Sequence, residues 1–141
     1  MVVLVQATVL TVGLNGRSEV LRELPIRLIK MQSGFEAARS LKNEKVNSVI
    51  SRWDLDDMPN GMFLKTFKAA KPYIPTIALV RAGSKSQEIA ARSLGVSAVI
   101  AEDATDDVFR STVANLLGLK GDIAIKAISS ADNVEELMRE G

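Results

Sequence analysis

Three aspartates after one short apolar run have the clearest capacity for chemistry in this chain. Asp54, Asp56 and Asp57 follow the apolar run 46–50. Carboxylates at this spacing could bind Mg²⁺, which usually takes one or two carboxylates and keeps several waters. The alternative that we favour is an acidic, solvated turn, in which Asp57 or Asn60 caps the helix that follows.

Two arginines end apolar runs and offer a second kind of chemistry. Arg52 closes the run that precedes the aspartates, and Arg81 closes a later one. If both runs are parallel strands, the two guanidinium groups flank one crevice and could bind a small anion, such as a nucleotide phosphate. The glycines around 13–16 do not match a dinucleotide-binding pattern, so this anion site is the weaker hypothesis.

Composition excludes several function classes. The chain has 141 residues, 47% of them apolar and 25% charged, with a net charge of +1, which indicates one globular domain with no strong field for nucleic acid or membrane. It has no cysteine and no histidine, which removes thiol chemistry, the commonest metal ligands and the commonest general base. We therefore expect no catalysis, no resident metal and no cofactor. The apolar N-terminus lacks a basic flank and a cleavage site, so we expect a cytoplasmic protein.

Strands and helices are expected to alternate along most of the chain. Period-two and period-3.6 patterns, with glycine and proline at the breaks, predict strands at 8–13, 26–31, 47–52, 75–81 and 97–101. They predict helices that start near Ser18, at 35–42, 61–71 and 86–94, and from a Thr105 cap to 117. This alternation predicts an α/β fold: a flavodoxin-like three-layer sandwich with a parallel five-stranded sheet of order 2-1-3-4-5.

The helical spacing also predicts which faces are buried. For the third helix we expect Met62, Phe63, Phe67 and Ala70 to face inward, and for the last helix Val108, Val113, Leu116 and Leu117. The domain is expected to span 1–119. Residues 120–141 are expected to be an extension, either a linker or a dimerisation element.

Several ordered segments carry a resemblance to a known family. They are Ser33-Gly34-Phe35-Glu36-Ala37-Ala38, Val49-Ile50-Ser51-Arg52-Trp53-Asp54, Asp57-Met58-Pro59-Asn60-Gly61-Met62-Phe63-Leu64-Lys65, Pro75-Thr76-Ile77-Ala78-Leu79, and residues 91–100 with Leu94-Gly95-Val96. Together they resemble the receiver domain of two-component response regulators, over roughly residues 8–117. The set in this order is specific for the fold and less specific for an activity.

The resemblance implies a phosphoryl-transfer site that this chain does not reproduce. Receivers carry an acidic pair after the first strand, an acceptor aspartate at the end of the third, Thr or Ser after the fourth, an aromatic residue in the fifth and Lys after it. The corresponding positions here are Val12-Gly13-Leu14-Asn15, Arg52 or Trp53, Val80 or Arg81, Val99, and Glu102 followed by Asp103. The chain thus resembles a degenerate receiver, or pseudo-receiver, that signals without phosphorylation. A receiver switch that uses Asp54 as a shifted acceptor is the first alternative, and a small-anion or nucleotide sensor that uses Arg52 and Arg81 is the second.

Charge reversal at two of these positions suggests an ion pair. Arg52 stands where the family has a carboxylate, and Glu102 where it has an ammonium group. We expect the two to pair, with Asp103 and Arg81 as further candidates, and to hold one conformation. For Trp53, the only tryptophan, ordinary loop packing is favoured over a cover for the former acidic pocket.

The resemblance also implies a partner surface on the fourth helix, fifth strand and fifth helix. Its candidate residues for a protein partner or a homodimer are Lys85, Gln87, Glu88, Arg92, Ser97, Asp106, Asp107 and Arg110. A fused or missing output domain fits the same family. Lys65, Lys68 and Lys71 recur at helical spacing and indicate a solvated face rather than a nucleic-acid interface, so no direct nucleic-acid or membrane contact is expected.

Overall fold

Five parallel strands form the sheet of the computed structural model, which describes residues 7–118. They are β1 (Ala7–Val12), β2 (Ile26–Met31), β3 (Ser48–Arg52), β4 (Thr76–Val80) and β5 (Ala98–Ala101). Their order is β2-β1-β3-β4-β5, and all four pairings are parallel. The predicted flavodoxin-like sheet is therefore confirmed. The expected extension 120–141 lies outside the described residues.

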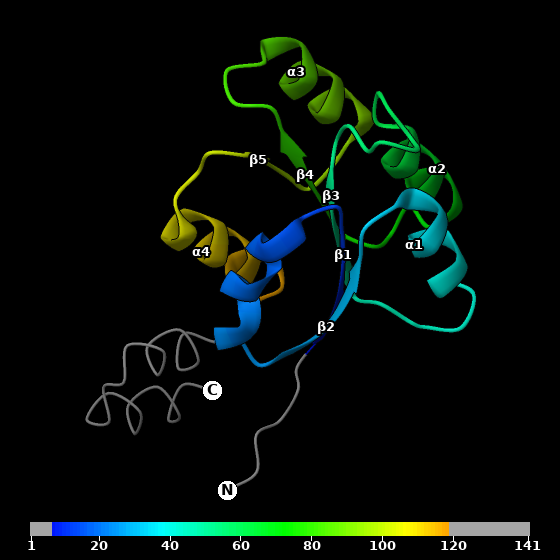
Figure 1. Ribbon diagram of the computed structural model, residues 1–141, viewed down its shortest axis with the longest axis vertical. Helices are drawn as coiled ribbons and strands as arrows, with labels where there is room; N and C mark the ends of the chain where they lie inside the picture. Colours follow the sequence, from blue (N-terminus) through cyan, green and yellow to red (C-terminus); the bar gives the residue numbers. More distant parts are fainter. Residues whose placement is uncertain (1–6, 119–141) are drawn as a thin grey trace, which may run out of the picture.

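Helices cover both faces of the sheet (Figure 1). They are the 3₁₀ helix η1 (Asn15–Glu23) and the α-helices α1 (Gly34–Ser40), α2 (Met62–Ala70), α3 (Lys85–Leu94) and α4 (Asp106–Leu116). One core cluster packs α1, α2 and α3 against the sheet, and a second packs η1 and α4 against the opposite face. The three layers follow from right-handed crossovers between parallel strands, which put a helix after each strand.

Residue type explains which strands are central and which lie at the edge. The five residues of β4, TIALV, are all buried, as expected for a strand covered on both faces. In β2 the apolar residues are only partly buried, and the charged residues Arg27 and Lys30 are exposed. Basic residues on an edge strand discourage pairing with other chains.

Three helices begin where a hydroxyl group caps them. Ser33, Ser84 and Thr105 each accept a hydrogen bond from the backbone N–H three residues later. Ser18 was predicted to do the same, and this prediction is wrong. Ser18 lies buried inside η1, where its hydroxyl donates to the carbonyl of Asn15, and η1 begins without a side-chain cap.

Two predicted helix faces are correct in part. In α2, Phe63 and Phe67 are buried as predicted, and Leu64 is buried too, while Met62 and Ala70 are exposed. In α4, Val113 is buried as predicted, and Leu116 and Leu117 pack against the core. Val108 is half exposed, and Phe109 is fully buried in its place. One residue turns a helix by about 100°, so a neighbour of a predicted residue can be the one that faces the core.

The parallel strands give the sheet two chemically different edges. We call the side where β1, β3, β4 and β5 end the carboxyl edge, and the side where β3 and β4 begin the amino edge. At the carboxyl edge Arg52 lies next to Leu79, and Val80 next to Ala101. Within residues 7–118 no helix is long and apolar enough to cross a membrane.

Candidate functional site

The carboxyl edge brings Arg52 and Glu102 together. Arg52 is the last residue of β3, and Glu102 follows β5 directly. The Arg52 Nε lies 3.2 Å from the Glu102 Oε2, and the two side chains are 36% and 33% exposed. The Glu102 backbone N–H also donates to the carbonyl of Val80 at 2.8 Å, which fixes the position of the Glu102 backbone from which the side chain extends. The predicted pairing is confirmed.

Arg81 does not join that ion pair. Its Nη2 lies 3.5 Å from the Asp54 Oδ2, which also accepts from the Gln87 Nε2 at 3.4 Å. The second oxygen of Asp54 accepts from the Asn60 backbone N–H at 2.5 Å. Each arginine thus faces its own carboxylate. The expectation that Arg81 joins Glu102 is wrong, because the Arg81 side chain turns toward α3 and the loop after β3.

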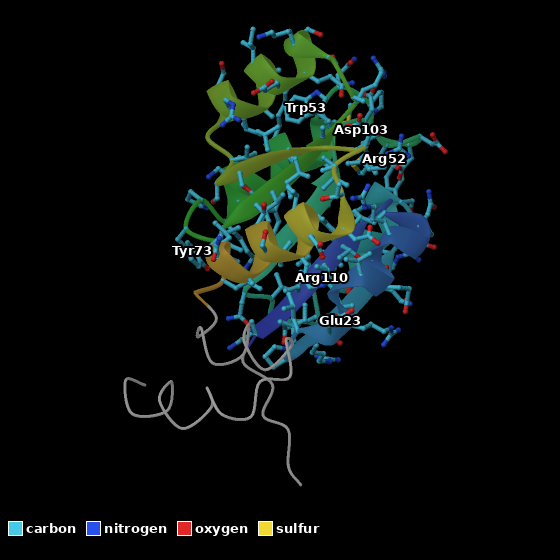
Figure 2. The ribbon with its side chains drawn as sticks, turned by 90° about the vertical axis from the view of Figure 1, so that its left-hand side faces the viewer. Glu23, Arg52, Trp53, Tyr73, Asp103 and Arg110 are labelled. Atoms are coloured by element: carbon cyan, nitrogen blue, oxygen red, sulfur yellow. The ribbon has the colours of Figure 1, made fainter. Side chains whose placement is uncertain are left out.

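Asp103 lies at the same edge and is exposed (Figure 2). It forms no ion pair with any residue in the described part of the chain. The expectation that Asp103 strengthens the Arg52–Glu102 contact is therefore wrong, because the backbone turns after Glu102 and directs the next side chain to solvent.

Trp53 packs into the core instead of covering the strand ends. It is 4% exposed, and its indole ring lies against Gly61 so closely that a Cβ there would overlap it. Gly61 has a φ of 75°, a left-handed value that glycine adopts readily. The Lys65 ammonium lies 5.8 Å from the ring centroid. Ordinary packing, the favoured alternative for this residue, is confirmed.

Asp57 caps a helix, but not the one we expected. Its two carboxylate oxygens accept from the backbone N–H groups of Gly34 and Phe35, at 3.0 and 2.9 Å, so it caps α1 from a distant loop. The bond from Gly34, reinforced by the one from Phe35, lowers the pKa of Asp57 below its usual value. The expected cap of α2 is wrong for both Asp57 and Asn60, because Gly61 occupies that position without a side-chain bond.

The donor set at this edge does not fit a Mg²⁺ ion. No three acidic residues converge anywhere in residues 7–118. Asp54 faces Arg81, Glu102 faces Arg52, and Asp57 is taken up by α1. The strand end at Val12 offers no acidic side chain, since Val12 is buried and Gly13 follows. Asp56 and Asp103 form no ion pair in residues 7–118, but both are exposed, and neither belongs to a cluster of acidic residues that could hold a hard cation.

The other positions aligned with receiver chemistry are apolar. Val80 is the buried last residue of β4 and packs in the core cluster under α2 and α3. Val99 in β5 packs against the same cluster. Neither side chain can donate a hydrogen bond to a phosphoryl oxygen.

Arg17 of η1 is a site residue that sequence reasoning missed. Its guanidinium donates to the carbonyl oxygens of Glu102, at 2.5 Å, and of Ala104. It also lies 3.8 Å from the Asp106 carboxylate and 5.3 Å from the ring centroid of Phe109. Arg17 therefore ties the loop after β5 and the start of α4 to η1, and no pattern in the sequence signals this contact.

The predicted partner surface divides into engaged and open residues. Among the engaged residues, Gln87 donates to Asp54, and Ser97 accepts from the Thr76 backbone. Glu88 pairs with Arg92, and Asp107 pairs with Arg110. Asp106 faces Arg17. Arg110 also donates to the backbone carbonyl of Val20 and lies 3.5 Å from Glu23. Arg110 and Glu23 are both labelled in Figure 2. Two exposed apolar residues were missed: Ile89 on α3 is 62% exposed and Val108 on α4 is 50% exposed. These two helices flank the edge strand β5.

No protein-family model matches the sequence, but individual proteins do. The chain is 30% identical over 94 residues to chemotaxis protein CheY homologues from three strains of Campylobacter jejuni subsp. jejuni, a match that covers 64% of this chain and 72% of theirs.

Solved structures agree on the fold. A signal receiver domain from Pseudomonas fluorescens Pf-5 superposes with a TM-score of 0.71 at 19% identity, over 79% of this chain and 94% of the other. A CheY-like response-regulator receiver domain from Methanospirillum hungatei JF-1 gives 0.70 at 15% identity, over 95% and 98%. At these identities the likeness concerns the fold.

Proposed function

Because the chain belongs to the CheY-like receiver domains of response regulators, we propose that it is a pseudo-receiver: a non-catalytic signalling domain of the cytoplasm that works through protein contact and without a phosphorylation cycle. The family membership rests on the comparisons. The loss of phosphorylation is our inference from the residues at the carboxyl edge.

The observation that carries this proposal is the ion pair between Arg52 and Glu102 at 3.2 Å. By resemblance, Arg52 or Trp53 occupies the position of the acceptor aspartate, and neither side chain can form an acyl phosphate. Glu102 occupies the position of the phosphoryl-binding lysine, and a carboxylate there repels a phosphoryl group. The pair already holds the two strand ends together, as charge-assisted contacts do. The fold thus has an ion pair at positions where, by resemblance, the family binds a phosphoryl group.

The test is phosphorylation by a small-molecule donor. The intact protein is incubated with acetyl phosphate and Mg²⁺, or with beryllofluoride and Mg²⁺, and examined by intact mass and by amide NMR shifts. We expect no added phosphoryl mass and no shifts at residues 52–54, 81 and 102. A receiver of known activity serves as the positive control for the reagents.

The shifted acceptor at Asp54 makes the opposite prediction. Its carboxylate already accepts from Asn60 and Gln87 and faces Arg81, which leaves it poorly placed as a nucleophile. Added mass that disappears in Asp54→Asn would overturn the pseudo-receiver and make the chain a functioning switch. Asp56→Asn is the matched control, because Asp56 is an exposed aspartate in the same loop.

For the contact itself we propose the surface of α3, β5 and α4, centred on Ile89 and Val108, with Lys85 and Asp107 at its rim. The support is two exposed apolar side chains on the helices that flank an edge strand. The double variant Ile89→Arg, Val108→Arg should abolish self-association or binding of the cognate partner. Tyr73→Arg, which changes an exposed aromatic residue elsewhere, should not. Light scattering after size exclusion measures self-association, and a binding assay measures partner binding. Equal effects of the two variants would contradict the assignment.

A further inference from the structure

A hollow lies at the amino edge, away from the proposed signalling site. It has a volume of about 700 Å³ and is lined by residues 41–47, between α1 and β3, and by residues at 71–75, between α2 and β4. Ligand pockets of small molecules commonly have volumes of about 300–1,000 Å³. Tyr73, one of its lining residues, lies on the other side of the molecule from Arg52 and Asp103 (Figure 2).

The frame of this hollow is fixed by hydrogen bonds. The Asn47 side chain accepts from the Thr8 backbone N–H at 2.7 Å, and the Asn47 backbone N–H donates to the Thr8 carbonyl at 2.7 Å. The Ser48 hydroxyl donates to the Pro75 carbonyl at 3.2 Å, which ties the two lining loops together. The site is therefore built on strand starts rather than on free loops.

Three lysines line the hollow without a partner. Lys42, Lys45 and Lys71 border it, and none of them forms an ion pair with a carboxylate in residues 7–118. The one acidic lining residue, Glu44, is held at 3.0 Å by Arg27. Three ammonium groups around one concave surface repel each other and together attract a polyanion.

An aromatic ring and an apolar floor complete the site. Tyr73 is 76% exposed, which is unusual for a large ring without a partner. Leu41, Val46, Ile74 and Pro75 line the hollow with apolar surface. A flat ring can stack on the Tyr73 ring while it covers part of this floor.

We propose that this hollow is a binding site for a phosphorylated ligand with a planar ring, of the class of a nucleoside diphosphate. The phosphates are bound by Lys42, Lys45 and Lys71, each acting as a point charge, and the base stacks on Tyr73. The phosphate secondary pKa of about 6 gives such a ligand about three negative charges near neutral pH, which matches the three lysines. The anion-binding capacity thus lies at the amino edge and not at Arg52 and Arg81, where each cation has its own carboxylate.

The experiment is a titration of the full chain, followed by amide NMR and calorimetry. The probes are ADP, adenosine and tripolyphosphate, each at two ionic strengths. We expect ADP to shift the amides of 41–47 and 71–75, to bind more tightly than either adenosine or tripolyphosphate, and to weaken as salt rises. This result is independent of the acetyl phosphate test, because the two sites share no residue.

Two sets of variants separate a specific site from general attraction of anions. Lys42→Gln, Lys45→Gln, Lys71→Gln together should weaken ADP binding about tenfold or more. The matched control Arg39→Gln, Lys65→Gln, Lys68→Gln removes the same charge from cationic side chains outside the hollow, none of which forms an ion pair among the described residues, and should leave binding within about twofold. Tyr73→Leu should weaken ADP binding and leave tripolyphosphate binding unchanged.

The proposal fails on any of three results. Absence of shifts at 41–47 and 71–75 would remove the site. Equal losses in the two triple variants would reduce it to non-specific charge. Equal affinity for ADP and tripolyphosphate, with no effect of Tyr73→Leu, would overturn the assignment of a ring-bearing ligand. Because all variants lie at exposed or partly exposed positions, thermal unfolding of each verifies that the fold is retained.

Discussion

The two edges of the sheet treat their cations in opposite ways. At the carboxyl edge Arg17, Arg52 and Arg81 each face a carboxylate, at 3.8, 3.2 and 3.5 Å. At the amino edge the lysines at 42, 45 and 71 border a hollow and pair with no carboxylate in residues 7–118. A paired cation stabilises the fold that holds it, whereas an unpaired cation raises the local electrostatic potential and attracts anions from solution. The difference therefore separates a structural edge from a binding edge.

The cation types agree with this division. Arginine has a planar fork that makes several directed bonds, and it carries the contacts of the carboxyl edge. Lysine is a mobile point charge on a flexible stem. The unpaired cations that line the hollow at the amino edge are lysines, whereas Arg27 there is paired with Glu44. The substitutions below should therefore cost stability at the first edge and cost little or none at the second.

The largest loss of stability is expected for Arg17→Met at the carboxyl edge. It removes two hydrogen bonds to the carbonyls of Glu102 and Ala104, the contact with Asp106 and the cation–π contact with Phe109. We expect the free energy of unfolding in urea to fall by about 2–3 kcal/mol. The matched control is Arg92→Met, which removes one exposed ion pair within α3 and should cost less than about 0.5 kcal/mol. Equal losses in the two variants would mean that Arg17 is not a structural link.

The next largest effect is expected for Asp57→Ala. The carboxylate satisfies two backbone N–H groups at the start of α1, and losing such a cap costs about 1 kcal/mol. Because the pKa of Asp57 is lowered in the folded state, its contribution is fully present above the ordinary aspartate value of 3.8 and is lost as the pH falls through the folded value. The difference between wild type and variant should therefore be constant at neutral pH and close in acid, as urea unfolding across pH measures. Asp56→Ala should show no such difference.

These two residues also mark the limit of what the sequence could predict. The alternation of strands and helices and the cap at Thr105 depend on local patterns, and they were predicted correctly. Arg17 and Asp57 act on partners 85 and 23 residues away. No periodicity records such contacts, because they exist only once the loops meet in the folded chain.

The candidate site was predictable only where charge alone decided it. The reversed charges at Arg52 and Glu102 were enough to predict their pairing, since parallel strands end at one edge. The partners of Arg81 depend on the conformation of the loop after β3, which brings Asp54 to Arg81 and Gln87. The exposed Met62 and the buried Leu64 show the same dependence, because helix phase is set by where a helix starts.

A smaller effect is expected for the pair that carries the proposed function. Arg52 and Glu102 are about one-third exposed, so solvent screens their attraction. A double-mutant cycle with Arg52→Gln and Glu102→Gln should give a coupling free energy of about 0.5 kcal/mol. A coupling near zero would remove the ion pair as a lock, even though the two groups are close. The cycle between Arg52 and Glu88, which lie on different elements and do not pair, is the control.

The smallest effect, and the one that most sharpens the comparison, is expected at the amino edge. Lys45→Gln removes one of three like charges around the hollow and breaks no ion pair or hydrogen bond among the described residues. Its free energy of unfolding should therefore stay within about 0.5 kcal/mol of the wild type and rise slightly at low salt, where like charges repel most. This sign is opposite to that of every substitution at the carboxyl edge. A loss of more than about 1 kcal/mol would show that Lys45 is a structural residue, and the amino edge would then be no more available to a ligand than the carboxyl edge.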